Sequence, residues 1–297
     1  MKSRWLTNIG LLVIVLITSL YSWTIFQKEP VESSKFELTN FKLSDFDELK
    51  IDFPSKISTH FKIIDNHWRM LSPHKARADQ LYVYRILSIL ATSSLEKLSA
   101  DDLSKYGLDQ PNLKMTFLGN NLKEVILFGT YNPINEDQYV LYNDNVFLIS
   151  GGFSETASFM PVELIEKNPI AKSEIIKSFD FSRLEQWQDS RLKLNYSNNV
   201  WSVEGKSLSI VQFDVNEWYE MTWKNIPAKS VEPYKMDQRV GYKSFDILLN
   251  NKKLTFYRVQ ESPELLLFRK DEGLLYHFPS DLGFTMLNPH VQQKEEN

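Results

Sequence analysis

The stretch LKMTFLGNNLKEVILFG, residues 113–129, carries the main fold signal of this chain. Two apolar runs flank Asn120-Asn121, and asparagine tolerates the positive φ that a tight hairpin turn requires. The same pattern returns at 244–259, SFDILLNNKKLTFYRV, around Asn250-Asn251. We therefore expect one antiparallel hairpin to occur twice in the chain.

The repetition extends to the segments around this hairpin. HFKIIDNHWRML (60–71) and RLKLNYSNNVWSV (191–203) each place an asparagine turn before a strand that carries a tryptophan, Trp68 or Trp201. Two copies are too few for a solenoid, so the pattern predicts two related units packed together. The other matched pair, in which each member has the pattern of strand, polar turn and strand, is 138–150 and 264–280.

Each copy also contains a predicted main helix. In 75–98 the apolar residues recur at helical spacing, and in the second copy a shorter helix begins at about Asp214 and ends before Pro227. The strands are short and joined by hairpins, which favours antiparallel sheets. The expected fold class is α+β: an N-terminal transmembrane helix followed by two tandem related α/β units, with mainly antiparallel sheets and a packed helix each.

The transmembrane helix is predicted from LTNIGLLVIVLITSLYSWTIF, residues 6–26, which contains no charged residue. About 20 helical residues at ~1.5 Å per residue cross a ~30 Å hydrocarbon core. Trp5 and Trp23 lie near its ends, where aromatic rings prefer the membrane boundary. A cleaved signal peptide is the alternative, although its apolar region is usually only about 7–15 residues long.

The charges before the apolar run predict its orientation. Lys2 and Arg4 precede it, and flanking basic residues stay in the cytoplasm. The expected location is the inner (cytoplasmic) membrane, single-pass, with the N-terminus in the cytoplasm and the C-terminal domain in the periplasm. The expected order is a cytoplasmic tip 1–4, a signal anchor 5–26, a linker 27–35, a first repeat unit 36–150, a bridging segment 151–178, a second repeat unit 179–290 and a flexible tail 291–297.

Composition limits the classes of function. The chain is 42% hydrophobic and 24% charged, as expected of a globular protein with a substantial core. Its net charge of −4 gives no basic footprint for nucleic acid. It has no cysteine, which excludes disulfides, cysteine metal sites and thiol catalysis.

The chemistry-bearing residues form no coherent catalytic or metal-binding set. His60, His67 and His74 are spaced by seven, but in a strand pattern that spacing puts neighbours on opposite faces. Adjacent carboxylates in loops and helix starts are typical of solvated positions, whereas a glycosidase needs two acids that face each other. GGFS (151–154) is not a Gly-x-Ser-x-Gly nucleophile elbow. We predict no catalytic residue, no cofactor and no metal site.

Four aromatic residues lie close together in the second copy. Core packing is one interpretation, because aromatic side chains bury large apolar areas. A partner-binding surface is the other, because Trp and Tyr are enriched at interface hot spots. The four residues are Trp187, Trp218, Tyr219 and Trp223.

The first copy also carries the residues of a family resemblance. Trp68 is followed by Pro73, by Ala78-Asp79 at a helix start, and by YGLDQP at 106–111. With the hairpin around Gly129, this order resembles the bacterial membrane-anchored proteins grouped as domain of unknown function 4340, over about residues 36–290. The residues assigned a structural motif here are Trp68, Tyr106, Gly107, Leu108, Asp109, Pro111 and, in the second copy, Trp201.

The YGLDQP motif has a direct physical interpretation. Gly107 lets a short helix that starts near Ser99 end in a left-handed conformation, and Leu108 can pack back on that helix. Asp109 can accept hydrogen bonds from backbone amides, and Pro111 stiffens the start of the next strand. The motif is therefore interpreted as a helix stop joined to a strand start, with a binding site as the alternative.

The resemblance implies a function that the residues alone do not. Members of the family often accompany ABC-type transport systems of the gliding-motility auxiliary kind, and no catalytic residues are established for them. We therefore expect a non-enzymatic, membrane-anchored periplasmic accessory or scaffold protein whose partners are the membrane and other envelope or transporter proteins. The alternative is an envelope hydrolase that uses carboxylate chemistry on a carbohydrate or cell-wall substrate. A deep pocket with a buried acid pair favours the hydrolase, and a continuous, shallow aromatic surface favours the scaffold.

Overall fold

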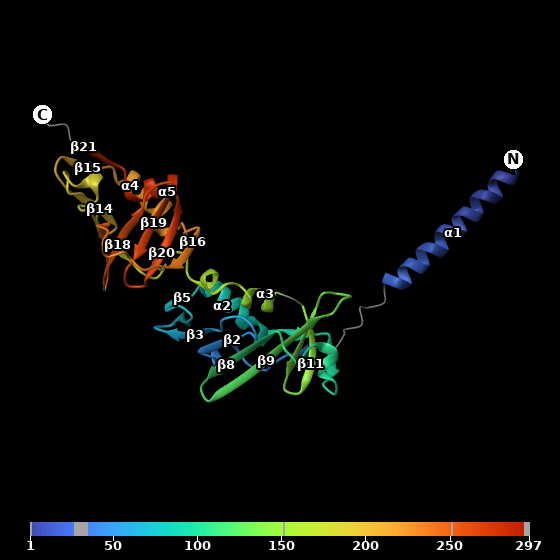
Figure 1. The fold of residues 1–297 in the computed structure, drawn as a ribbon. Coiled ribbons are helices and arrows are strands. Elements are labelled where there is room, and N and C mark those ends of the chain that lie inside the picture. The colour runs from blue at the N-terminus through green and yellow to red at the C-terminus, as the bar shows by residue number, and fades with distance from the viewer. Residues whose placement is uncertain (1, 27–34, 151, 251, 294–297) are drawn as a thin grey trace.

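Two large antiparallel sheets dominate the computed structural model, which describes residues 2–26, 35–150, 152–250 and 252–293 (Figure 1). The first sheet has nine strands, in the spatial order β5 (Ala76–Arg77), β4 (His67–Ser72), β3 (Thr59–Ile64), β2 (Glu48–Asp52), β8 (Leu113–Gly119), β9 (Leu122–Tyr131), β10 (Gln138–Tyr142), β11 (Asn145–Ile149) and β7 (Glu96–Ser99). The second has eight, in the order β14 (Val200–Glu204), β13 (Lys193–Ser197), β12 (Ile176–Asp180), β17 (Lys243–Leu249), β18 (Lys253–Gln260), β19 (Glu264–Arg269), β20 (Leu274–Pro279) and β16 (Ser230–Pro233).

Short elements complete the two units. Two small two-stranded sheets pair β1 (Phe36–Glu37) with β6 (Ser93–Ser94) and β15 (Leu208–Ile210) with β21 (Val291–Gln293). The α-helices are α1 (Lys2–Phe26), α2 (Gln80–Leu87), α3 (Phe153–Ala157), α4 (Gln212–Tyr219) and α5 (Ser280–Leu287). Single turns of tighter or wider helix are η1 (Leu43–Asp45), η2 (Ser88–Ala91), η3 (Leu103–Tyr106), η4 (Pro161–Leu164), η5 (Glu185–Trp187) and η6 (Glu220–Lys224).

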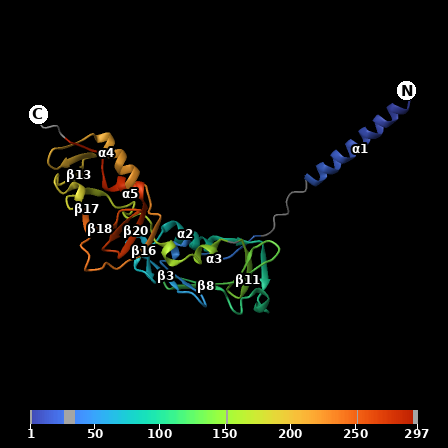
Figure 2. The same cartoon turned by 45° about the horizontal axis from the view of Figure 1, so that its top comes forward.

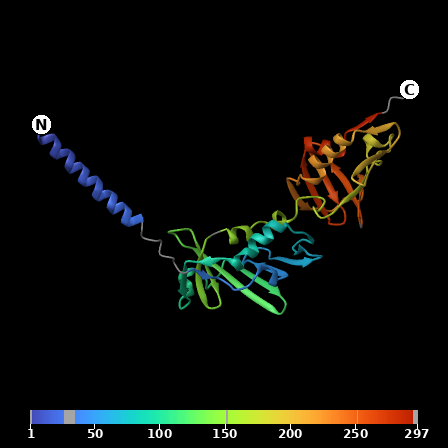
Figure 3. The same cartoon turned by 180° about the vertical axis from the view of Figure 1, so that it is seen from behind.

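The strand order of the first sheet recurs in the second. From β4 to β7 in one sheet, and from β14 to β16 in the other, eight strands follow each other in the same spatial and sequence pattern. Trp68 on β4 and Trp201 on β14 therefore lie on equivalent strands, and both are buried. Figures 2 and 3 show the helix pair of each unit, α2 with α3 and α4 with α5, on the inner side of the bend between the units.

Asparagine turns define the hairpins. Asn120 and Asn121 have φ of 40° and 66° and connect Gly119 directly to its strand partner Leu122, which confirms the predicted hairpin turn. Asn198 and Asn199 show the same geometry, with φ of 48° and 62°. Two successive residues with positive φ match the right-handed twist of the flanking strands. Asn251, the second residue of the other predicted asparagine turn, lies outside the described residues.

The predicted helices are shorter than expected. The α-helix within 75–98 is only α2, eight residues long, because residues 76–77 pair with β4 and a helix cap begins at Asp79. The Asp79 carboxylate accepts hydrogen bonds from the backbone N–H of Leu81 and Tyr82, at 2.9 and 3.4 Å. In the second unit, α4 continues into the single wide turn η6 and ends before Pro227, as predicted.

The predicted α+β class is wrong, because sheet dominates the described fold beyond α1. No described helix there exceeds eight residues, whereas the two main sheets have nine and eight strands. The stretch 93–99, predicted to contain the end of one helix and the start of the next, instead supplies β6 and β7. Antiparallel pairing across β11 and β7 satisfies those backbone groups and outweighs their weak helical preference.

The predicted transmembrane anchor is contradicted as well. Among the helices in the described part of the chain, none combines the length and the apolar character needed to cross a membrane. This finding overturns the anchor at 5–26 and the single-pass inner-membrane location inferred from it.

A buried polar cluster joins the two units. The Arg77 guanidinium, on β5, donates hydrogen bonds to Glu272 Oε1 at 2.5 Å and to the Tyr276 hydroxyl at 3.0 Å, both in the second unit. It also donates to the carbonyl oxygen of Asn168 at 2.7 Å. Burial alone lowers the pKa of Arg77, but Tyr276 and Glu272 raise it well above its ordinary value.

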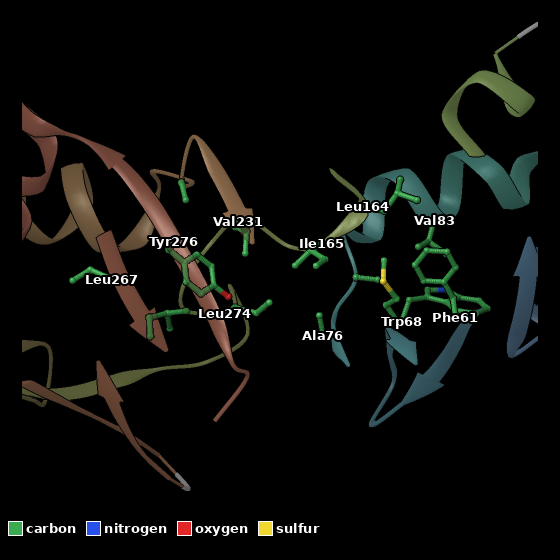
Figure 4. Close-up of a cluster of buried hydrophobic side chains, with 14 of the residues drawn as sticks. Phe61, Trp68, Ala76, Val83, Leu164, Ile165, Val231, Leu267, Leu274 and Tyr276 are labelled. Carbon is green, nitrogen blue, oxygen red and sulfur yellow. The ribbon is translucent and has the colours of Figure 1, made fainter. Parts of the chain in front are cut away.

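Apolar side chains continue the junction on both sides of this cluster. Figure 4 shows Ala76 and Ile165 of the first side facing Val231 and Tyr276 of the second. All four are buried. The junction therefore combines apolar contact with a buried ion pair, and it holds the two units together.

Candidate interaction surfaces

A glutamine clamp fixes the start of a helix in each unit. The side chain of Gln80 accepts a hydrogen bond from Trp68 N at 2.9 Å and donates one to Trp68 O at 3.0 Å. Gln212 makes the same two bonds with the backbone of Trp201. Each glutamine opens its helix, α2 or α4, so the clamp holds the first helical turn against the edge of the sheet.

The residue after each clamp points into solvent. Leu81 is 74% exposed and Phe213 is 72% exposed, although both are large and apolar. Sequence analysis singled out neither glutamine. The usable signal was the spacing, because Gln80 follows Trp68 by twelve residues and Gln212 follows Trp201 by eleven.

Two helices of the second unit carry a wider apolar surface. We call Phe213, Met221 and Phe284 the α4–α5 surface; the exposed fractions of Met221 and Phe284 are 61% and 63%. The Trp218 indole N–H donates to the carbonyl of Thr285 at 2.7 Å, which fixes α5 beside α4. Phe213 lies in α4 and Met221 in the wide turn η6 that continues it, and both side chains are exposed.

The first unit has a comparable surface at α2 and η4. We call Leu81, Tyr84 and Met160 the α2–η4 surface; Tyr84 is 49% exposed and Met160 is 64% exposed. The Tyr82 and Phe159 rings meet edge to face at 5.5 Å between centroids, which ties α2 to the segment before η4. Clusters of exposed apolar side chains are typical of binding surfaces.

The four aromatic residues that the sequence offered as a possible partner-binding surface belong to neither of these two surfaces. Trp218 and Trp223 are 1% and 2% exposed, and Trp187 and Tyr219 are partly buried against the same core. The indole N–H groups of Trp187 and Trp223 donate to the carbonyls of Leu287 and Met286, at 2.9 and 3.1 Å. With Trp218 they satisfy three successive carbonyls at the end of α5. The structure therefore buries Trp218 and Trp223 in the core and packs Trp187 and Tyr219 against it.

The YGLDQP motif forms a helix stop. Gly107 has φ of 64° and follows η3, and Leu108 is 2% exposed, as the structural interpretation requires. The Tyr106 ring packs on Tyr139 at 4.9 Å between centroids. A Cβ atom on Gly107 would lie 2.7 Å from Thr130 Cγ2, so space as well as backbone conformation demands glycine.

We expect Gly107→Val to destabilise the fold by about 2 kcal/mol or more, because a β-branched residue is strained in the left-handed region. Denaturant unfolding measures the loss. Gly241→Val is the matched control, because a Cβ atom there meets nothing within 4 Å. Unchanged stability of the Gly107 variant would contradict the helix-stop interpretation.

One buried carboxylate in the second sheet is paired with cations. Asp246 is 5% exposed and accepts hydrogen bonds from Arg183 at 2.9 Å and Thr255 at 2.8 Å, and Lys253 Nζ lies 2.7 Å away. Burial alone raises the pKa of this carboxyl, but the bonds from Arg183 and Lys253 outweigh it and lower the pKa to about 2. Its neighbours are cations rather than a second acid, unlike the pair that glycoside hydrolysis requires.

This pKa predicts a pH-dependent contribution to stability. The folded value of about 2 lies below the ordinary 3.8, so the stabilisation is present above pH ~4 and is lost as the pH falls through that range. We expect Asp246→Asn to lower the free energy of unfolding by about 2 kcal/mol at neutral pH. The difference from the unchanged chain should vanish near pH 2, and a difference independent of pH would contradict the assignment. Asp237→Asn, at an exposed ion pair, is the control.

Two neighbouring cavities lie beside Tyr131. One, of about 270 Å³, is lined by Lys56, Gln138 and Ser154; the other, of about 550 Å³, is lined by Glu136, Asp137 and Glu155. Glu136 and Glu155 are exposed and Asp137 is half-buried. In the described ranges, no group of three or more His, Asp or Glu side chains is placed to hold a metal ion. These cavities therefore lack the buried facing acids that favour the hydrolase.

Comparison with known proteins bears on the family alone. Neither the curated proteins nor the solved structures gave a match. The family model described as Domain of unknown function (DUF4340) matches residues 68–261, which include both tryptophan strands and both glutamine clamps. The match covers more than half of the chain, so the chain belongs to this family.

Proposed function

We propose that this chain is a non-enzymatic accessory or scaffold protein that holds partner proteins together in an ABC-type transport assembly. The observation that carries the proposal is the pair of exposed apolar helix surfaces, one on each unit at equivalent places. Leu81 and Phe213 follow the two glutamine clamps, and exposed apolar side chains beside each extend the contact area. Groups of exposed apolar side chains are typical of protein–protein sites.

The architecture also supports a holding role. Two surfaces on separate units can bind partners together only if the units keep a fixed relative orientation. Linked sites gain avidity only when their geometry lets both be occupied at once. The buried contacts of Arg77 with Glu272 and Tyr276 support such a fixed orientation. The cavities beside Tyr131 offer no paired buried acids, which leaves the hydrolase without a supporting observation.

Site-specific photo-crosslinking in the producing cell tests the proposal. A photoreactive side chain replaces Leu81 or Phe213 in the full chain, and mass spectrometry identifies the attached protein. Ile134 serves as the control, because it is 90% exposed but lies in the loop between β9 and β10. We expect both helix positions to attach to subunits of a transport assembly and Ile134 to attach to none. Absence of such adducts at both helix positions would overturn the proposal.

A further inference from the structure

We infer that the α4–α5 surface binds a basic amphipathic helix of the partner protein, an inference that rests on the proposed scaffold function. The apolar part of the site is Phe213, Met221 and Phe284, and all three are more than half exposed. An amphipathic helix presents its apolar residues as a stripe that fits such a surface. The charges around the surface then decide which helix is preferred.

Carboxylates surround the apolar residues. Glu217 lies four residues after Phe213 and four before Met221, so it sits between them on the same helix face. Asp214 and Glu220 add two further acids to 212–224, and Lys224 is the one base in that sequence. Lys224 is held by Glu220 at 2.5 Å. The segment therefore has three acids against one base, and a net charge of −2.

Helix α5 also places an acid near an exposed apolar residue. Asp281 precedes Phe284 by three residues, which places both on one face of α5. The bond from Trp218 to Thr285 holds this face beside α4, and Thr285 directly follows Phe284. The apolar residues thus lie between acids on both helices, and a partner helix with Lys or Arg beside its apolar stripe complements them.

The equivalent surface of the first unit differs in charge. The sequence of α2, QLYVYRIL, contains Arg85 and no acid, while Asp79 caps this helix and Glu163 of η4 accepts a hydrogen bond from Met160 N at 2.9 Å. Leu81 and Tyr84 are exposed there as Phe213 and Met221 are in the second unit, but a cation accompanies them. The α2–η4 surface therefore matches the α4–α5 surface in apolar character and is less acidic. It has Asp79 and Glu163 against Arg85, whereas 212–224 together with Asp281 has four acids against one base.

Binding of synthetic peptides to the full chain tests the inference. The probe is a fluorescent amphipathic helix with leucine on one face and lysine and arginine on the other; the comparison peptide carries glutamate at every basic position. We expect the basic peptide to bind at least about tenfold more tightly, and high salt to remove most of that preference. Equal binding of the two peptides would overturn the inference.

Variants locate the site. Phe213→Ser should weaken binding of the basic peptide about tenfold or more, because hot-spot aromatics dominate such contacts. Asp214→Asn with Glu217→Gln should weaken it several-fold and reduce its salt dependence. Ile134→Ser, at an exposed apolar loop residue outside both surfaces, should leave it unchanged. An equal loss with Ile134→Ser, or sedimentation of the full chain as a dimer that occupies the surface, would overturn the inference.

The two proposals fail in different ways. Transport-subunit adducts at positions 81 and 213, together with no preference for the basic peptide, overturn the charge inference and leave the scaffold function standing. Absence of adducts at both positions overturns the scaffold function itself.

Discussion

Arg77→Ala should destabilise the folded chain by about 3 kcal/mol, because it removes the cation that hydrogen-bonds the buried Glu272 and leaves only Arg269, 3.5 Å away, to pair with that carboxylate. The Arg77 guanidinium bonds to Glu272 at 2.5 Å and to the Tyr276 hydroxyl at 3.0 Å across the junction of the two units. The Glu272 side chain is only 9% exposed, so water cannot replace the lost partner. Denaturant-induced unfolding of the full chain, followed by tryptophan fluorescence, measures the loss.

Two controls separate this effect from loss of any arginine. Arg239→Ala removes an arginine whose side chain is 88% exposed and which bonds to Asp237, so we expect little change. Adding Glu272→Gln to Arg77→Ala should restore part of the stability, because the buried carboxylate charge that lost its hydrogen-bonded cation disappears. A loss for Arg77→Ala no larger than that for Arg239→Ala would show that the cluster does not hold the junction.

Trp218→Ala should cost about 3–5 kcal/mol, because it removes a large side chain that is buried in the core of the second unit. The Trp218 ring contacts Phe179 and Phe181 at 5.1 and 6.3 Å between centroids, and its indole N–H bonds to Thr285 O at 2.7 Å. The substitution leaves a cavity and frees the end of α5. Thermal or denaturant unfolding measures both consequences together.

Trp218→Phe divides this cost into its parts. It keeps most of the packing and removes the hydrogen bond, so we expect a loss of only about 1–2 kcal/mol. If Trp218 were a binding residue on the surface, both variants would keep the stability of the unchanged chain and lose partner contact instead. Near-normal stability of Trp218→Ala would therefore contradict the core assignment.

The hairpins were predictable from sequence because their cause is local. Asn120 and Asn121 tolerate positive φ, and the apolar runs on both sides require a pleated, half-buried surface. The helix stop at Gly107 was predictable for the same reason, since a left-handed residue after a helical turn strongly favours glycine. In these places the neighbouring residues alone determine the backbone.

The helix lengths were not predictable in this way. Apolar residues within 75–98 recur at helical spacing, yet residues 76–77 pair with the neighbouring strand β4, and residues 93–94 pair with the distant residues 36–37. Long-range strand pairing therefore overrides the local helical preference. The junction cluster has the same character, because nothing near Arg77 in the sequence points to Glu272, almost two hundred residues later.

The exposed surfaces were not predicted, because the sequence shows which residues are aromatic or apolar but not whether each side chain faces the core or solvent. Trp218 and Met221 are three residues apart on adjoining turns, yet the first is 1% exposed and the second is 61% exposed. The face toward the core depends on the clamp between Gln212 and Trp201, which sets the rotation of α4 against the sheet. Only the folded sheet brings those two residues together.

Quantitative capture of partner proteins tests the scaffold function most directly. The full chain is recovered from its producing cells in three forms: unchanged, with serine at Leu81 and Phe213, and with serine at Ile57 and Ile134. All four residues are strongly exposed and apolar, so neither double variant should disturb the core. We predict that the Leu81 and Phe213 variant loses the transport subunits captured by the unchanged chain, while the Ile57 and Ile134 variant keeps them. Undiminished capture by the Leu81 and Phe213 variant, or equal loss in both variants, would contradict the assignment of partner binding to the α2–η4 and α4–α5 surfaces.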